Sequence, residues 1–141
     1  MKKILLVLAV LATGITCYFM WNKPHQDVKD ADALKISAID LYNTFITDSA
    51  KAKSAYTDKV LLVSGEVNRV SLNQQGQQVV LIKTDVTGAF INCTMEEEKE
   101  ILKTGDDITI KAVCNGYISG DTDMGLPGDV FLTRGYLLNG K

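Results

Sequence analysis

The sequence is poor in the residues that most often carry chemistry. Its 141 residues include three cysteines, two prolines and one histidine, His25, close to the N-terminus. The rest of the chain therefore cannot assemble a Ser/His/Asp or Cys/His catalytic arrangement, or attach haem through a histidine. The cysteines have no Cys-x-x-Cys spacing, which leaves no signature of a zinc or redox site. We expect a protein that is not an enzyme and that holds no metal or cofactor.

An excess of basic residues is also missing beyond the N-terminus. All 17 Asp and Glu follow residue 26, so residues 25–141 hold 12 basic and 17 acidic residues, a net charge of −5. Proteins that bind nucleic acid usually gain affinity from basic side chains that contact phosphates. The charge therefore disfavours nucleic acid as a partner. A local basic stripe would have to be built from Arg69, Lys83, Lys111 and Arg134.

Charge is absent from Ile4 to Trp21, directly after Lys2 and Lys3. Eighteen residues span about 27 Å as a helix, which is close to the bilayer core of about 30 Å. The preceding lysines favour a cytoplasmic N-terminus. We expect residues 1–22 to form an uncleaved membrane anchor, with the domain on the extracytoplasmic side. Two alternatives remain: a lipoprotein modified at Cys17, and a signal peptide cleaved near residues 12–14.

The segment after the apolar start is predicted to be a tether followed by helices. Residues 23–30 are polar and contain a proline, which is typical of a short linker. Residues 31–57 are expected to form a helical extension. Apolar residues from Leu34 to Phe45 recur at helical spacing, with Asp30 or Asp32 as the N-cap. A second helix, capped by Asp48, is expected to follow.

Residues 58–138 show the pattern of a small barrel. Five runs have β character: Lys59–Leu72, Gln78–Thr84, Ala89–Cys93, Ile108–Ile118 and Val130–Leu138. Between the third and fourth runs, Thr94 and Glu97 match a capping box for a helix over Met95–Lys103. Gly65 suggests a bulge or a sharp coil in the first strand. This order predicts a mainly β fold, a five-stranded Greek-key OB-fold barrel with N-terminal helices, preceded by a transmembrane helix.

Several short segments resemble a known family. They are Ala55-Tyr56, Lys59–Val67, Asn92-Cys93, Gly105-Asp106, Ile110-Lys111, Cys114–Tyr117 and Asp129–Leu132. The sequence over about residues 35–138 is similar to the tRNA-anticodon-like OB domain of exported bacterial proteins, notably those of Bacteroidetes. This resemblance implies the fold and a location in the bacterial cell envelope, as a single-pass protein facing the periplasm. It implies no particular activity.

Cys93 and Cys114 are the candidates for a disulfide. Each shares a strand face with isoleucines, so both thiols are expected in the barrel interior. Exported proteins often contain disulfides. The sequence is compatible with a bridge between the two cysteines and equally with two free buried thiols.

A ligand site is expected on the face formed by the second and third strands of the barrel. Aromatic residues on strands can stack against a ligand, and we name Phe90, Asn92 and Tyr117 as the candidate ligand-binding residues. Others considered for this face are Gln78, Val80, Ile82 and the loop over residues 119–128. That loop contains Asp121 and Asp123 but lacks the glycine and glutamate that an EF-hand requires at its sixth and twelfth positions.

These observations lead to one functional hypothesis and its alternatives. The leading hypothesis is a non-enzymatic OB-fold binding module, tethered to the membrane through residues 4–21, whose partner is an envelope protein, a peptide or a glycan. The alternative from a different class is a protein that binds single-stranded nucleic acid. A lipoprotein with the same fold is a further alternative.

Overall fold

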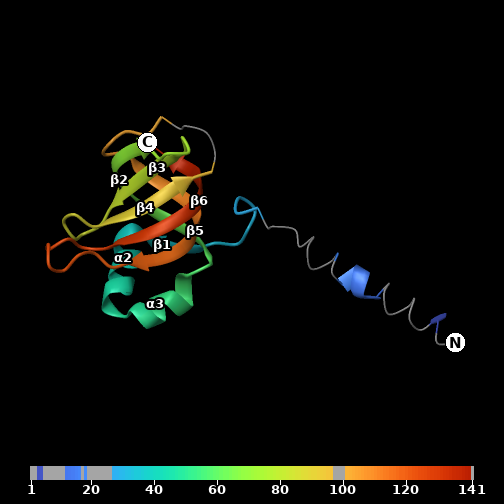
Figure 1. Cartoon of the computed structure of the whole chain (residues 1–141). Helices are drawn as coiled ribbons and strands as arrows, with labels where there is room; N and C mark the ends of the chain where they lie inside the picture. Colours follow the sequence, from blue (N-terminus) through green and yellow to red (C-terminus); the bar gives the residue numbers. More distant parts are fainter. Residues whose placement is uncertain (1–2, 5–11, 17, 19–26, 97–100, 141) are drawn as a thin grey trace.

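The computed structural model describes residues 3–4, 12–16, 18, 27–96 and 101–140 (Figure 1). Its elements are β1 (Leu34–Ser37), α2 (Ala38–Thr47), α3 (Ser49–Tyr56), β2 (Val60–Leu72), β3 (Gln78–Lys83), β4 (Phe90–Met95), β5 (Asp107–Ile118) and β6 (Asp129–Gly140). The membrane anchor expected over residues 4–21 lies largely outside the described residues. Within those residues, no helix has the length and apolar character that crossing a membrane requires.

Five strands close into a barrel. They pair in the order β2–β3–β4–β6–β5, and β5 pairs again with β2 to complete the circle. The β4–β6 pairing is parallel, and the other pairings of the barrel are antiparallel. This is the strand order of an OB-fold, so the predicted mainly β barrel is confirmed. The ends of the five strands agree with the sequence prediction to within about two residues.

The barrel interior is filled by alternate residues of every strand. Val63 and Val67 of β2 are fully buried, whereas Ser64 between them is exposed. The same alternation buries Val80 and Ile82 of β3. This period-2 pattern places one face of each strand in the core and the other on the outside of the barrel.

Gly65 lies between the part of β2 that pairs with β1, which ends at Ser64, and the part that pairs with β3, which begins at Val67. A Cβ atom at this position would come within 2.5 Å of Ile82 Cγ2 and 3.0 Å of Ala38 Cβ. The close approach of these neighbours requires glycine. The sequence prediction of a sharp coil is consistent with this, but the register shift in the β2–β3 pairing lies farther along, between Val67 and Arg69.

The N-terminal extension differs from the predicted pair of helices. Leu34–Ser37 is a strand, β1, which pairs in parallel with residues 61–64 of β2. The first helix therefore starts at Ala38, and its N-cap is Ser37, whose side chain accepts a hydrogen bond from the Asp40 N–H. Pairing with the otherwise open edge of β2 outweighs the helical spacing of these residues. The second helix, α3, has the predicted cap at Asp48.

The connection between β4 and β5 does not match the helix predicted over Met95–Lys103. Thr94 and Met95 belong to β4, and Thr94 pairs with Val79, so Thr94 is no helix cap. Ile101–Lys103 have no regular secondary structure. Residues 97–100, including Glu97 of the expected capping box, lie outside the described residues. The capping pattern predicted that a helix starts after Thr94, but the pairing of Thr94 with Val79 places this residue inside a strand.

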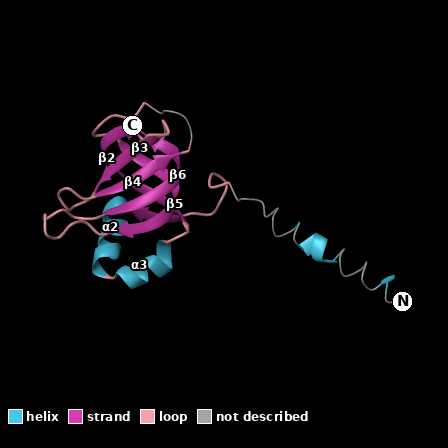
Figure 2. Cartoon of the chain, viewed as in Figure 1, coloured by secondary structure: helices cyan, strands magenta, loops and turns pink. Residues whose placement is uncertain are grey.

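The two helices pack against one end of the barrel (Figure 2). The buried face of α2 consists of Ala38, Leu41, Tyr42 and Phe45, and α3 buries Ala52. These residues of α2 are the ones whose helical spacing was seen in the sequence, whereas Leu34 lies in β1.

The last residues of the predicted tether pack onto the barrel. Val28 is buried, and Asp27–Asp30 form a turn in which the Asp30 N–H donates to the Asp27 carbonyl. The Lys111 ammonium donates to the Lys29 carbonyl at 2.9 Å. The Lys29 ammonium lies 5.9 Å from the centre of the Tyr136 ring. The described part of the expected linker, residues 27–30, therefore belongs to the folded domain.

Candidate functional site

A row of outward-facing residues crosses four strands of the barrel. In register, Arg69 of β2 lies opposite Leu81 of β3, Leu81 opposite Asn92 of β4, and Asn92 opposite Phe131 of β6. Side chains directly opposite on neighbouring strands have Cβ atoms about 5 Å apart. The row therefore places a cation, two apolar side chains and an amide next to one another. We call this surface, together with Phe90, the outer face.

Phe90 is the second aromatic residue of the outer face. It lies two residues before Asn92 and therefore on the same side of β4, diagonal to Phe131. Both phenylalanines are half-buried, so part of each ring is open to solvent. The Phe90 N–H donates to Asp129 Oδ1 at 2.8 Å, which ties the start of β4 to the start of β6. Burial raises the pKa of Asp129.

Tyr117, the third predicted ligand-binding residue, does not lie on the outer face. Its ring packs against α2, with its centroid 6.0 Å from that of Tyr42 and 6.3 Å from that of Phe45. The Tyr42 hydroxyl donates to the Gly128 carbonyl at 3.0 Å, and burial beside Tyr117 raises the pKa of Tyr42 to about 12. Register shifts in the β5–β6 pairing turn the end of β5 toward the helices. Tyr117 is thus a packing residue.

Three further candidates of the sequence analysis point inward. Gln78, Val80 and Ile82 are the buried residues of β3, while Val79, Leu81 and Lys83 alternate with them on the outside. A ligand on the outer face would contact the second set. The apolar run of β3 gave no signal of which set faces the interior.

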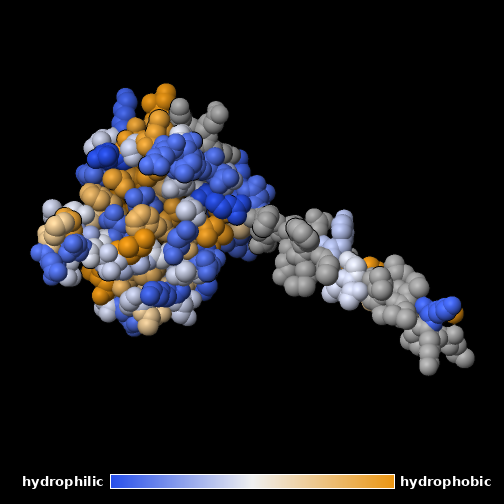
Figure 3. Space-filling view, viewed as in Figure 1, coloured by the Kyte–Doolittle hydropathy of each residue, from blue (hydrophilic) through white to orange (hydrophobic). Residues whose placement is uncertain are grey.

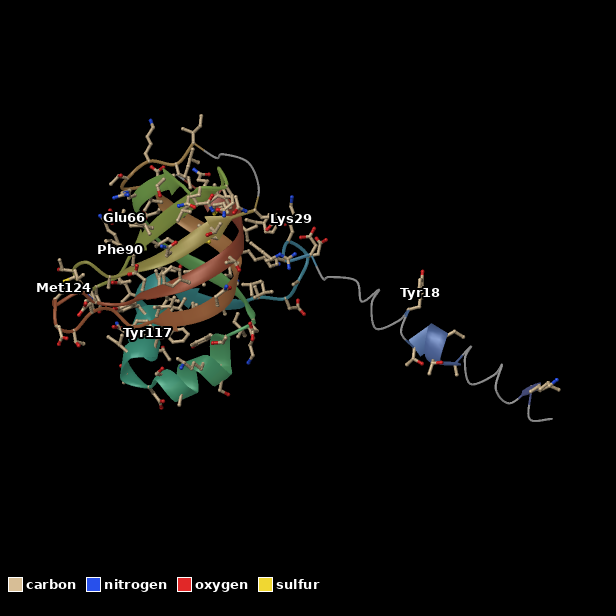
Figure 4. All side chains as sticks on the ribbon, in the orientation of Figure 1. Tyr18, Lys29, Glu66, Phe90, Tyr117 and Met124 are labelled. Atoms are coloured by element: carbon tan, nitrogen blue, oxygen red, sulfur yellow. The ribbon has the colours of Figure 1, made fainter. Side chains whose placement is uncertain are left out.

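A groove with a volume of about 760 Å³ adjoins the outer face. It is lined by residues 37–39 at the junction of β1 and α2, residues 64–66 of β2, residues 83–84 at the end of β3, and residues 107–109 at the start of β5. Lys83 connects it to the outer face, because Lys83 lies directly opposite Phe90 in the β3–β4 pairing. Figure 4 shows Glu66 and Phe90 close together on one side of the barrel, whereas Lys29 is on the other.

The groove contains two opposed carboxylates and one cation. Glu66 and Asp107 are directly opposite in the β2–β5 pairing, and the Lys83 ammonium forms an ion pair with Glu66. Asp107 is exposed and has no ion-pair partner among the residues that the structure describes. Sequence analysis missed both acidic residues as site residues. Alternation along β2 predicts that Glu66 points outward, but only the strand pairing reveals Asp107 as its neighbour.

The proposed basic stripe does not form as a set of free cations. Lys83 pairs with Glu66, Lys111 donates to the Lys29 carbonyl, and Arg134 Nε lies 4.0 Å from Glu96 Oε2. Arg69 is the one of the four candidates that lies on the outer face without a described acidic partner. Figure 3 shows small apolar areas separated by hydrophilic side chains over the domain.

Cys93 and Cys114 are free, buried thiols. Both pair with Leu132, which places β6 between them. Two strand spacings separate their Cα atoms by about 9.5 Å, beyond the reach of about 7 Å for a disulfide. The bridge considered from the sequence is therefore absent. Burial raises the pKa of Cys93 to about 12 and that of Cys114 to about 11. Cys17 lies outside the described residues.

The loop between β5 and β6 is organised by hydrogen bonds of its own. Asp121 Oδ1 accepts from the N–H groups of Asp123 and Met124, and the Leu126 N–H donates to the Asp121 carbonyl. The Asp121 carboxylate thus shapes the turn. Within the described part of the chain, no three or more His, Cys, Asp and Glu side chains gather where they would hold a metal ion.

The solved structures that match this chain in shape include two different proteins. One is a protein of Leishmania major Friedlin assigned as an aspartyl-tRNA synthetase, with 8% identity and a TM-score of 0.46 over 85% of this chain. The chain spans 22% of the length of that protein. The other is OBody AM3L09, determined bound to hen egg-white lysozyme, with 17% identity and a TM-score of 0.37 over 62% of this chain and 92% of its own.

The search of curated proteins found no match to the sequence. The tRNA_anti-like family model matches residues 1–124. The match extends from the apolar N-terminal segment through the barrel as far as the β5–β6 loop. With most of its length matched, this chain belongs to the tRNA_anti-like family.

Proposed function

We propose that this protein is a non-enzymatic binding module that takes an extended peptide segment of a partner protein on its outer face. The observation that carries the proposal is the row from Arg69 to Phe131, with Phe90 beside it. Two half-buried aromatic rings on adjacent strands offer apolar contact area, and they lose little conformational entropy on binding. Arg69 and Asn92 add hydrogen-bonding groups in the same row.

The charge of the domain supports a protein ligand over a nucleic acid. Residues 25–141 carry a net charge of −5, and three of the four candidate basic residues already contact Glu66, Glu96 or the Lys29 carbonyl. Phosphate contacts normally require several available cations along one surface. A glycan would also suit aromatic rings, so it is a competing ligand in the test below.

The location of the module is part of the proposal. The uncharged stretch from Ile4 to Trp21 behind Lys2 and Lys3 supports an anchor in the bacterial cell membrane, with the domain facing the periplasm. A barrel attached through the residues preceding Lys29 would present Phe90 on its far side (Figure 4). Measuring the mass of the N-terminal peptide of the native protein distinguishes an intact anchor from cleavage or from a lipid on Cys17.

The test of the proposed function is selection of binding peptides by the full chain. A random dodecapeptide library displayed on phage is selected on the intact protein in detergent, and the affinity of the enriched peptides is measured for variants. Phe90→Ala and Phe131→Ala should each weaken binding about ten-fold, the effect expected for anchoring aromatic residues. Ile46→Ala, which truncates an exposed residue of α2, is the control. Enriched peptides whose affinity is unchanged by both Phe90→Ala and Phe131→Ala would refute the proposal.

Single-stranded nucleic acid is the second candidate ligand, because the chain belongs to the tRNA_anti-like family and Arg69 lies in the same row as Phe131. Bases can stack on aromatic side chains of such a surface. A gel shift with single-stranded oligonucleotides at 20 mM salt, lost in Phe90→Ala, would favour this candidate over a peptide. The affinity would also fall steeply as salt is added.

A further inference from the structure

The groove beside the outer face has a feature that the aromatic row lacks, a carboxylate that has no ion-pair partner among the described residues. Glu66 and Asp107 lie directly opposite each other, an arrangement of like charges that is unfavourable across a strand pair. Lys83 neutralises Glu66 from the neighbouring strand. Asp107 remains exposed beside this pair. A second cation in the groove would relieve the repulsion between the two carboxylates.

We infer that the groove binds an arginine or lysine side chain of the peptide ligand, with its cationic head group between Asp107 and Glu66. This inference rests on the proposed function, because it assigns a residue type to part of the ligand on the same surface. Lys83 lies between the groove and Phe90, so a peptide whose basic side chain occupies the groove can continue over the outer face.

Hydroxyl groups next to the carboxylates suit such a head group. Ser37, Ser64 and Thr109 lie opposite one another across β1, β2 and β5 and form a row along the groove. Ser37 already bonds Asp40, whereas the described residues offer no partner to the hydroxyls of Ser64 and Thr109. Ammonium and guanidinium groups carry several N–H donors that need acceptors. Carboxylate and hydroxyl oxygens on adjacent strands supply them.

The lining of the groove suits a long side chain. The groove lies where the edge of β2 passes from β1 to β3, between Ser37 at the end of one strand and Lys83 at the end of the other. Ile39 at its wall is 46% exposed and can contact the aliphatic stem of an arginine or lysine. An anionic ligand would meet two carboxylates and one cation, and is excluded on charge.

The test uses two peptides that differ in charge and hardly in shape. The full chain, labelled with ¹⁵N, is titrated with acetyl-Ala-Arg-Ala-amide and with the same peptide containing citrulline. The arginine peptide should shift the backbone amide signals of Ser64, Gly65 and Thr109, and the citrulline peptide should bind about two- to five-fold more weakly, the range expected for an exposed ion pair. Equal shifts from the two peptides would overturn the inference.

Matched variants separate the groove from the overall acidity of the protein. Asp107→Asn should reduce the affinity for the arginine peptide to that for the citrulline peptide, and Asp107→Glu should retain most of it. Asp123→Asn makes the same change of charge on the β5–β6 loop and should have no effect. An equal loss of affinity in Asp123→Asn would also overturn the inference. So would a titration with the neutral sugar cellobiose that shifts the same amide signals as much as the arginine peptide does.

The outcomes distinguish this inference from the proposed function. If the arginine peptide does not bind in the groove while the affinity of selected peptides still depends on Phe90 and Phe131, the outer face remains the ligand site and the inference fails. If arginine binds at Asp107 while peptide binding is independent of both phenylalanines, the groove stands and the proposed use of the outer face fails.

Discussion

Lys83 lies directly opposite Phe90 across the β3–β4 pairing, and its ammonium group reaches the other way to Glu66 on β2. One side chain therefore joins the acidic groove to the aromatic part of the outer face. This continuity is the basis for treating groove and face as one ligand surface. Apart from residues 37–39 and Thr84 in the groove, the residues of that surface lie on strands of the barrel, so the fold sets their positions.

The opposed carboxylates predict an electrostatic role for Lys83. Lys83→Met should lower the free energy of unfolding by no more than about 1 kcal/mol, since the ion pair is partly exposed and screened by solvent. The loss should shrink in 1 M NaCl and in an Asp107→Asn background, where Glu66 no longer faces a like charge. Urea unfolding of the original protein, the two single variants and the double variant measures the coupling energy between Lys83 and Asp107. A loss that is the same in both backgrounds would contradict the electrostatic explanation.

The close contacts of Gly65 predict a steric effect. Gly65→Ala should destabilise the domain by about 1–3 kcal/mol, because Ile82 and Ala38 must move to admit the Cβ atom. Ser64→Ala, at the exposed neighbouring position, should stay within about 0.5 kcal/mol of the original protein. Thermal unfolding monitored by circular dichroism compares the two. Equal stability of the two variants would show that the barrel relaxes at Gly65.

The buried hydroxyl of Tyr42 links α2 to the base of the β5–β6 loop. Tyr42→Phe removes its hydrogen bond to the Gly128 carbonyl and should cost about 1 kcal/mol of stability. Amide exchange in residues 119–128 should become faster, since the loop loses its connection to the helix. Tyr56→Phe is the control, as its ring also packs on Phe45. Unchanged loop exchange in Tyr42→Phe would refute this link.

The two buried cysteines predict that stability falls in alkaline solution. In the unfolded chain these thiols ionise near their ordinary pKa of 9.0, whereas burial raises the pKa of Cys93 to about 12 and that of Cys114 to about 11. Above pH 9 the unfolded state therefore binds fewer protons than the folded state. Each thiol then lowers the free energy of unfolding by about 1.4 kcal/mol per pH unit up to its folded pKa.

Urea unfolding between pH 8 and pH 11 measures this slope. Cys93→Ala should make the slope shallower, although the variant should be less stable at pH 8, where the thiol is protonated in both states and its removal leaves a small cavity. Tyr42 adds to the decrease above pH 10, since its pKa is also raised. Iodoacetamide at pH 8 should modify Cys93 and Cys114 only after unfolding. Rapid modification of either cysteine in the folded protein would contradict the buried positions of their thiols.

Much of the barrel follows from local pattern in the sequence. The alternation of Val63, Ser64 and Val67 shows which side of β2 is buried, and the turn around Gly76 joins β2 to β3 as expected. Local pattern failed where tertiary pairing decides the structure. Leu34–Ser37 has helical spacing but pairs with an open strand edge, and Thr94 has the sequence of a cap but lies inside a strand.

The site was predicted less well than the fold, for a physical reason. Phe90 was identified as an aromatic residue on a strand, and Asn92 was named with it on the face of the second and third strands; both lie on the outer face. Tyr117 was misplaced because register shifts near the end of β5 cannot be read from alternation. The neighbours Glu66 and Asp107 are 41 positions apart in the sequence, so only the pairing of β2 with β5 brings them together.

The most direct test of the ligand surface maps where a selected peptide binds on the full chain. The ¹⁵N-labelled protein is titrated with the tightest peptide from the phage selection, and the change in each backbone amide signal is measured. The outer face and its groove predict the largest changes in β3, β4 and β6 and at residues 64–66, with α3 unaffected. Changes concentrated on α2 and α3, with β3 and β4 unaffected, would contradict the account.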